Sequence, residues 1–264
     1  MSTVVKIFNF FIKSVIASIK SASEYKISFI TNTIFMIINN SVFLVSWYVI
    51  FQNAGSDDAV NFKKVLSLWA LSTISYGINY FFFGGVSNIN RFLIDGELDM
   101  YLTKPKNPLI AVLTSKCRFS ACGDLIFGII IAVYVSNSLV DFVQILVFGI
   151  YGTVFLLSIE IILRSLSVWL GDTETLTSRL VTNMFISITT YPLDIFGTFV
   201  KIITFTVIPA AYAVHLPLEI IDNFSFSKLL IVTFAGIFFV SLAIFTFNKA
   251  IKSYESGNNI SMKI

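Results

Sequence analysis

Side chains that carry acid–base chemistry are scarce in the apolar parts of this sequence. Glu160 and Arg164 stand four residues apart near the end of one apolar run, and Asp124 lies near the start of another. An i, i+4 pair on a helix explains Glu160 and Arg164 as a structural contact, and Asp124 is placed to reach the membrane interface or to pair with Arg118. An enzyme within such runs would need convergent acids, paired histidines or a Ser/Lys dyad. The sequence shows no such cluster, so we predict no catalytic residue.

The histidine and cysteine content predicts no metal site. His215 is the only histidine, and Cys117 and Cys122 are five residues apart. This spacing matches neither a zinc site nor a redox pair. We interpret both cysteines as small apolar packing residues, which free cysteines commonly are.

The composition predicts an all-α, polytopic membrane protein. Of the 264 residues, 56% are apolar and 12% are charged, and the mean hydropathy is +0.85. Soluble domains carry about 25% charged residues. No loop between apolar runs reaches the roughly 50 residues of a small domain, so a separate soluble catalytic domain is excluded.

Six apolar segments have the length and character of transmembrane helices. They are 27–51, 65–89, 119–136, 139–169, 176–191 and 226–248. The intervening segment 192–225 is apolar but is interrupted by Pro192, Pro209 and Pro217. We expect it to form two short half-helices that re-enter the outer leaflet. The alternative, two full crossings and eight spans, would leave about 17 residues for each crossing, which is at the lower limit.

The distribution of basic residues orients the chain in the cell membrane. With both termini in the cytoplasm, 14 of the 18 Lys and Arg residues lie inside, and only Lys63, Lys64, Lys201 and Lys228 lie outside. We therefore expect three parts: an N-terminal segment 1–26, a six-span domain 27–250 and a cytoplasmic tail 251–264. The spanning domain contains a cytoplasmic loop, 91–108, and the re-entrant segment 192–225.

The N-terminal segment has the pattern of an amphipathic interfacial helix. Lys6, Lys13 and Lys20 recur every seven residues and share one helical face. The other face carries Phe8, Ile12, Val15 and Ile19. Such a helix lies in the headgroup plane with its lysines toward anionic lipid. It either anchors the chain or acts as a lever between the membrane and a cytoplasmic partner.

The most polar stretch, 95–109, reads DGELDMYLTKPKNPL and lies in the predicted cytoplasmic loop. Asp95 or Gly96 is placed to start a short helix with Glu97 and Asp99 in its first turn, where acids suit the helix dipole. Leu98, Tyr101 and Leu102 then form a small apolar face, and the prolines end the helix. This pattern favours a docking element, although a loop helix lying on the membrane surface is the simpler alternative.

Two stripes of polar residues run along predicted spans. Each stripe lies within about 40° on a helical wheel. The first consists of Ser28, Asn32, Asn39 and Ser46, and the second of Ser178, Thr182 and Thr189. They either line a translocation path or subunit interface, or are hydrogen-bonded packing seams.

Two motifs resemble those of permease subunits of type-2 ATP-binding-cassette (ABC) exporters. GELDMYLTKPKNPL is similar to the family loop G-x-L-D-x-x-L-x-[KR]-P-x-x-P. Downstream, TTYPLDIFGTFVKIITFTVIPAAYAVHLPLEII resembles the family segment with Tyr-Pro, Ile-Pro and a later proline. The resemblance covers essentially the whole chain. Lys106 departs from it, because many relatives have an apolar residue there.

The resemblance implies that the loop is a coupling helix that docks on a separate ATPase subunit. The predicted coupling residues, which combine the loop pattern with the family motif, are Asp95, Gly96, Glu97, Leu98, Asp99, Tyr101, Leu102, Lys104, Pro105 and Pro108. No G-x-x-x-x-G-K-[ST] phosphate loop occurs in the sequence, so ATP and Mg²⁺ are expected on the partner and this chain has no cofactor of its own. The implied assembly has two ATPase copies and a second permease, identical or similar, in membrane lipid, with no nucleic acid.

The expected function is export of an amphipathic cargo, such as a drug, lipid or hydrophobic peptide. The high phenylalanine content and the lack of charges in the two polar stripes favour this interpretation. Tyr191, Pro192, Pro209 and Pro217 are predicted to form an outer gate. A stand-alone secondary transporter is the main alternative, although it would predict mid-membrane acids and broken helices in two symmetric halves. An intramembrane enzyme is less favoured.

Overall fold

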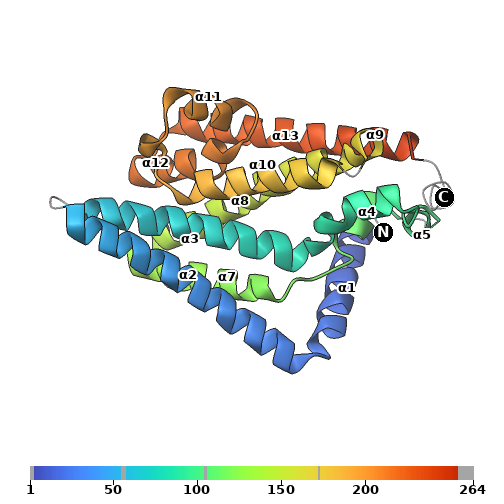
Figure 1. Ribbon diagram of the computed structural model, residues 1–264, viewed down its shortest axis with the longest axis horizontal. Helices are drawn as coiled ribbons and strands as arrows, with labels where there is room; N and C mark the ends of the chain where they lie inside the picture. The colour runs from blue at the N-terminus through green and yellow to red at the C-terminus, as the bar shows by residue number, and fades with distance from the viewer. Residues whose placement is uncertain (1–2, 55–57, 104–105, 172, 255–264) are drawn as a thin grey trace.

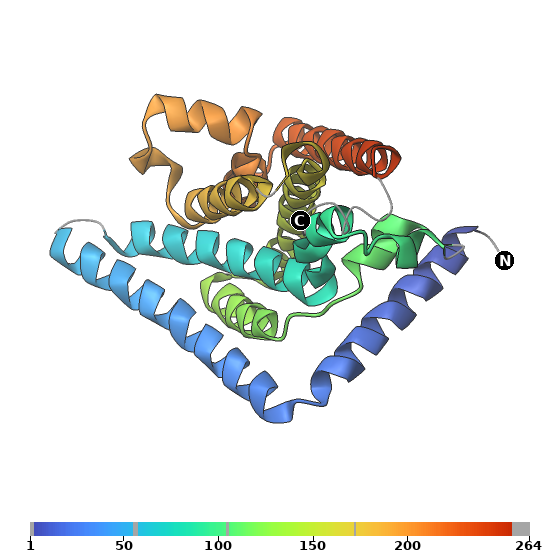
Figure 2. The same cartoon turned by 45° about the vertical axis from the view of Figure 1, so that its right-hand side comes forward.

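The computed structural model describes residues 3–54, 58–103, 106–171 and 173–254, and confirms an all-α protein. No strand occurs in these ranges. The long helices are α1 (Thr3–Ser23), α2 (Lys26–Ala54), α3 (Asp58–Phe82), α7 (Ser120–Val135), α8 (Leu139–Ser165), α10 (Thr173–Thr190) and α13 (Phe226–Lys252). As Figure 1 shows, most of them run along the long axis of the molecule, whereas α1 leaves α2 at a sharp angle. Figure 2 shows this angle more openly.

Short helices connect the long ones at the two ends of the bundle. One end holds the 3₁₀ helix η1 (Gly84–Asn88), α4 (Ile89–Ile94), α5 (Asp99–Leu102), α6 (Pro108–Leu113) and α9 (Ser167–Leu170). The opposite end holds η2 (Leu193–Ile195), α11 (Thr198–Thr206), the π-helical turn η3 (Ala211–His215) and α12 (Leu216–Asp222). The chain therefore carries one set of connecting elements at each end of an apolar bundle.

Three described helices are long and apolar enough to cross a membrane: Lys26–Gln52, Leu139–Leu170 and Phe226–Lys252. A fourth is counted if Thr198–Thr206 and Ala211–Asp222, which are bent by 81°, form one broken span. Four predicted spans correspond closely to α2, α7, α10 and α13, and the fourth predicted span covers α8 and α9. These helices confirm several apolar helical segments, and the count of six crossings stays a prediction.

The predicted second span ends seven residues too late. It was expected to reach residue 89, but α3 ends at Phe82 and the chain turns into η1. Gly84 and Gly85 are both buried there, and a Cβ on Gly85 would collide with the carbonyl oxygen of Val112. Since the segment packs backbone to backbone against a later part of the chain, it cannot continue as an ordinary helix.

Close contacts at small residues join the central helices. α3 packs mainly against α7 and α8. A Cβ added to Gly128 of α7 would lie 2.6 Å from the Thr73 hydroxyl oxygen, and one added to Gly152 of α8 would collide with that of Ser75. The Ser75 hydroxyl donates to the Gly149 carbonyl at 3.0 Å. In lipid, where burying apolar surface contributes little free energy, helices associate through close packing at small residues and through interhelical hydrogen bonds.

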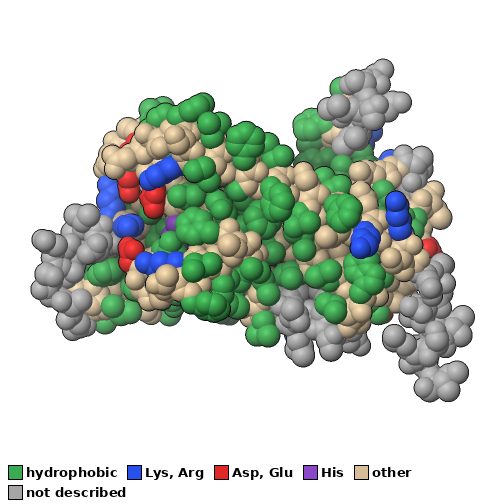
Figure 3. Space-filling view, turned by 90° about the horizontal axis from the view of Figure 1, so that it is seen from above, with side chains coloured by type: hydrophobic (Ala, Val, Ile, Leu, Met, Phe, Trp, Pro, Cys, Tyr) green, Lys and Arg blue, Asp and Glu red, His purple; other side chains and the backbone are tan. Residues whose placement is uncertain are grey.

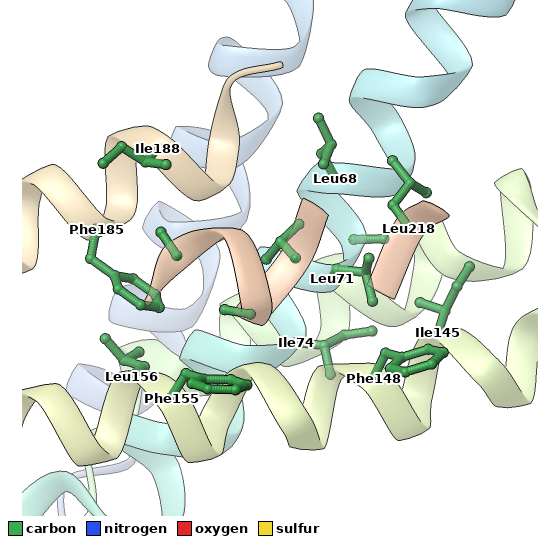
Figure 4. Close-up of a cluster of buried hydrophobic side chains, with 14 of the residues drawn as sticks. Leu68, Leu71, Ile74, Ile145, Phe148, Phe155, Leu156, Phe185, Ile188 and Leu218 are labelled. Carbon is green, nitrogen blue, oxygen red and sulfur yellow. The ribbon is translucent and has the colours of Figure 1, made fainter. Parts of the chain in front are cut away.

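The core lies where α3, α8, α10 and the η3–α12 segment meet. Figure 4 shows its side chains converging from these elements, with Phe155 and Leu156 of α8 facing Phe185 of α10. Phe155, Leu156 and Phe185 are almost completely buried. In contrast, α2 and α13 expose large apolar side chains over much of their length. Figure 3 shows the visible face as a broad apolar surface with charged residues gathered toward its ends.

The N-terminal helix contacts the linker between α6 and α7. Ser18 donates to the Thr114 carbonyl at 2.8 Å, and the Thr114 hydroxyl donates to Ser14 at 2.8 Å. The Lys106 ammonium lies 4.1 Å from the ring centroid of Phe10. In the same linker, burial raises the pKa of the Cys117 thiol to about 12. The linker is therefore held on both sides, by α1 and by the bundle.

Candidate functional site: a folded loop, a buried polar network and a cavity between helices

The loop that was predicted to dock on an ATPase subunit folds into a compact knob, with a turn and a short helix, and is not extended. α4 ends at Ile94, and Gly96 then adopts φ 76°, a left-handed conformation that favours glycine. This reversal brings the Leu98 amide back to the Phe92 carbonyl at 3.1 Å. The short helix consequently begins at Asp99, later than the predicted start at Asp95 or Gly96.

The predicted apolar face of this helix is divided between the interior and the surface. Leu98 is fully buried in a cluster with Ile89, Phe92 and Phe247. The Tyr101 ring packs on Phe92, with centroids 5.2 Å apart. Met100 and Leu102, by contrast, expose 51% and 37% of their surface. Leu98 and Tyr101 thus fix the knob to the bundle, while Met100 and Leu102 face outward.

Polar residues shape the rim of the knob. Arg91 and Glu97 form an exposed ion pair at 2.9 Å. Asn107 caps α6 by accepting hydrogen bonds from the Leu109 and Ile110 amides, with Pro108 at the first helical position. Asp95 and Asp99 are half-buried. The predicted coupling residues Lys104 and Pro105 lie outside the described residues.

A buried polar network connects the base of the knob to the middle of the bundle. Glu160 is fully buried, and its carboxylate accepts hydrogen bonds from Asn79 at 2.9 Å and from the Tyr80 hydroxyl at 3.0 Å. Arg164 lies 3.4 Å from the same carboxylate and also donates to the Ser87 carbonyl at 3.3 Å. The predicted Glu160–Arg164 pair is therefore present, within a larger network that the sequence did not indicate.

The network continues to Arg118. The Arg118 guanidinium lies 4.9 Å from the ring centroid of Tyr80. The Arg118 amide donates to the Tyr80 carbonyl at 3.1 Å. A chain of contacts therefore runs from Ser87 of η1, the element that precedes α4, through Arg164, Glu160 and Tyr80 to Arg118.

Arg118 opens onto a cavity of about 240 Å³ between α2, α3, α7 and α10. Asp124 lies in its wall and accepts a hydrogen bond from Asn40 at 2.9 Å. Of the two expectations for Asp124, contact with the membrane interface or a pair with Arg118, the pair is not among the ion pairs of the described residues. The aromatic residues Trp69, Tyr76 and Tyr80 contribute to the wall, as do polar residues of α2, α3 and α10, namely Asn39, Asn40, Ser72, Thr73 and Thr190. The cavity is thus apolar and aromatic with a few convergent polar groups, which is the usual character of a small-molecule site.

The structure separates the two predicted polar stripes. Ser28, Asn32, Asn39 and Ser46 lie on the exposed side of α2, where Asn32 donates to Ser28 at 3.2 Å. Thr182 and Thr189 are buried inside the bundle, and the Ser178 side chain lies outside the described part. Asn39 joins the cavity wall, so one of the predicted path residues meets the site. The cavity wall also contains two charged residues, Asp124 and Arg118, which lie outside both predicted stripes.

The predicted gate residues fall into two groups. Tyr191 packs against Phe43 and Trp47 of α2, with ring centroids 5.7 and 5.5 Å apart. Pro192 precedes η2. Pro209 and Pro217 are buried around η3, where His215 Nε2 lies 2.8 Å from the Ile188 carbonyl oxygen. His215 is therefore engaged in joining η3 to α10.

Sequence reasoning missed three residues that build this site: Asn79, Tyr80 and Trp69. It indicated Asn40, beside Asn39, as a candidate for a path or subunit interface, but not its partner Asp124. Asn79 and Asn40 each lie inside an apolar helix, where an amide is costly unless it finds a partner. This cost was the one sign in the sequence that each amide must have a buried hydrogen-bond partner. Their partners, Glu160 and Asp124, are more than 80 residues away in the chain, so spacing could not assign the pairs.

The comparison with known families agrees with this architecture. The sequence profile described as ABC-2 family transporter protein matches residues 35–258. The chain belongs to this family. No curated protein and no solved structure matched the chain. This ABC-2 family member is accordingly a multi-pass membrane protein, the permease component of an ABC transporter, which associates with an ABC ATPase.

Proposed function

We propose that this chain is the membrane-spanning subunit of an ATP-driven exporter that moves an amphipathic cargo, such as a drug, lipid or hydrophobic peptide, out of the cell. The energy would come from a separate ATPase subunit, present in two copies and carrying ATP and Mg²⁺. The observation that carries the proposal is the knob formed by residues 91–103 and 106–108, which has a buried base and an exposed apolar tip.

The tip has the character of a docking surface. Met100 and Leu102 both lie on α5 and are exposed, and the same knob carries the exposed Arg91–Glu97 ion pair. An apolar centre with a polar rim is the usual anatomy of a protein interface. The base, through Leu98, is packed against α13, so a force on the tip reaches the bundle.

The buried network supplies a route from the knob to the cavity. When ATP closes the ATPase pair, the knob moves and carries η1 with it. The Ser87 carbonyl is bonded to Arg164, so the movement alters the Arg164–Glu160 contact and then Tyr80 and Arg118 at the cavity wall. A densely packed, hydrogen-bonded path has few intermediate arrangements, and such paths transmit discrete changes.

In this account six helices cross the cell membrane: α2, α3, α7, α8, α10 and α13. The 192–225 segment re-enters from outside. Its support is the 81° bend between the two short helices and their place at the end of the bundle opposite the knob (Figure 1). Both termini then lie in the cytoplasm. Helix α1 lies on the inner membrane surface, where its contacts with Thr114 and Lys106 support a role as a lever.

A second permease, identical or similar, would pack against α2. The support is the exposed polar stripe of this helix, Ser28 to Ser46, on a surface that is otherwise apolar. Polar groups that face lipid alone are costly, whereas the same groups hydrogen-bond well between helices. Tyr191 packs against this helix, so an outer gate formed by Tyr191, Pro192, Pro209 and Pro217 would sense the pairing.

Site-specific crosslinking tests the docking surface. A photoreactive amino acid at Met100 should crosslink to a protein that contains a G-x-x-x-x-G-K-[ST] phosphate loop, identified by mass spectrometry. The same amino acid at Ile237, which is exposed in the apolar middle of α13, is the matched control and should not. Crosslinking at Ile237 but not at Met100 would refute the proposed docking surface.

A further inference from the structure

The Asp124 carboxylate occupies an unusual electrostatic position. It is 7% exposed and lies in the wall of the cavity between α2, α3, α7 and α10. Its hydrogen-bond partner is the neutral amide of Asn40, at 2.9 Å. Among the described residues, no ion pair joins Asp124 to a Lys, Arg or His nitrogen within 4.0 Å. A buried carboxylate without a cation is costly, and inside apolar helices such a residue commonly marks a path for a substrate, an ion or a proton.

Arg118 shares the cavity but is engaged elsewhere. Its guanidinium lies over the Tyr80 ring at 4.9 Å, and its side chain is exposed. Arg118 therefore stands at the opening, on the path to the Glu160 network. Among the described residues that line the cavity, Asp124 is the one acid and Arg118 the one base, and the Arg118 guanidinium is directed to the Tyr80 ring.

The remaining wall fits the body of an organic cation. Trp69, Tyr76 and Tyr80 present aromatic surface, and rings of this kind attract alkylammonium groups. Trp69 stacks on Phe43 with centroids 3.8 Å apart, which holds its indole in place. The Trp69 indole N–H is buried and has no partner among the described residues. It is available to a ligand oxygen.

We propose that this cavity binds the cationic head group of the cargo, with Asp124 as its counter-ion and the aromatic residues around it. The proposal rests on the proposed export function and narrows the amphipathic cargo to cationic amphiphiles. A volume of about 240 Å³ is below the roughly 300–1,000 Å³ of drug-sized sites, so it takes a head group and leaves the apolar tail outside.

Binding to the chain alone, in lipid nanodiscs, tests the proposal without any ATPase. The probe is radiolabelled benzyltrimethylammonium, and its neutral isostere is neopentylbenzene, which has the same shape without the charge. Wild-type protein should bind the cation at least about tenfold more tightly than the isostere, which corresponds to about 1.4 kcal/mol. Asp124→Asn should remove this preference. Asp222→Asn, which removes an exposed acid at the outer end of α12, should keep it.

Equal affinity of wild type for the cation and its isostere would overturn the proposal, and so would undiminished cation binding by a folded Asp124→Asn variant. If that variant does not fold, the affinities of wild type for the cation and for the neutral isostere still test the proposal, because this comparison needs no substitution. If the protein binds an ATPase but does not prefer the cation over its isostere, only the head-group site is refuted. If the protein prefers the cation but binds no ATPase, the ATP-driven exporter proposal is refuted and the head-group site remains supported.

Discussion

Among single residues, the buried charged side chains Glu160 and Arg164 form the polar contacts that link helices α3 and α8 and the η1 turn. The sequence indicated Glu160 and Arg164 as a helical pair, and this contact is present at 3.4 Å. It could not indicate that Asn79 and Tyr80 complete the site, because these residues come from a helix about 80 positions earlier. Similarly, the sequence allowed Asp124 to reach the membrane interface or to pair with Arg118, and it did not indicate the hydrogen bond from Asn40. Local spacing predicts i, i+4 contacts, whereas contacts between helices depend on how the bundle packs.

We expect Glu160→Gln to destabilise the protein by about 3–5 kcal/mol, because it leaves the largely buried Arg164 without its carboxylate. The double variant Glu160→Gln/Arg164→Met should recover much of this loss, since neither charge then remains unpaired. Thermal unfolding in detergent, followed by a fluorescent thiol or tryptophan signal, measures both. Strictly additive losses in the double variant would show that the two charges are not coupled.

Gly96→Ala should cost about 1–2 kcal/mol, because φ 76° places a Cβ against the following carbonyl oxygen. Gly197→Ala is the matched control: its φ is −64° and a Cβ there meets no atom within 4 Å. Unfolding midpoints of the two variants, measured side by side, test this. A Gly96 variant as stable as the Gly197 variant would contradict the left-handed turn at the knob.

At the scale of elements, apolar length predicted the long helices well and their ends less well. The third predicted span, 119–136, differs from α7 by one residue at each end. The second overran α3, because the approach of Gly85 to Val112 is a tertiary contact that hydropathy does not register. In the loop, the spacing of Leu98, Tyr101 and Leu102 predicted a single apolar face. Gly96 turns the chain so that Leu98 points inward instead.

Because Leu98 is buried and Leu102 is exposed, the same Leu→Asp substitution should affect the stability of the protein very differently at these two positions. Leu98→Asp should unfold or severely destabilise the protein, because it puts a carboxylate into a fully buried apolar cluster. Leu102→Asp should leave the unfolding temperature nearly unchanged, since this side chain is already exposed to solvent. Size-exclusion profiles and thermal unfolding of both variants provide the comparison. A stable Leu98→Asp protein would place Leu98 on the surface and contradict the structure.

At the scale of the whole molecule, the bundle has two different ends. The knob, α9 and the end of α13 lie at one end, and α11, α12 and the start of α3 lie at the other (Figure 1). The charges at the α11–α12 end pair locally, as in Lys228–Glu219 at 2.6 Å and Lys201–Asp194 at 3.7 Å. Basic residues predicted which end faces the cytoplasm. Composition alone could not predict whether 192–225 crosses or re-enters, because both arrangements keep the same ends inside.

Cysteine labelling tests this arrangement in a background where both native cysteines are serine. An impermeant maleimide applied to intact cells should label Asn223→Cys, at the outer end, and should not label Lys252→Cys until the cells are opened. Val207→Cys, at the bend between α11 and η3, should not be labelled from the cytoplasmic side. Labelling of this position from the cytoplasm would favour two full crossings in place of the re-entrant segment.

The most direct test of the central claim, that this chain is driven by an ATPase docked on the knob, is quantitative co-purification in mild detergent. Wild type is compared with Met100→Asp/Leu102→Asp, and bound ATPase and ATP hydrolysis are both measured. We expect wild type to retain an ATPase and to hydrolyse ATP. In the folded double variant, bound ATPase and the rate of ATP hydrolysis should each fall at least about tenfold. An equal amount of ATPase on the double variant, or none on folded wild type, would contradict the central claim.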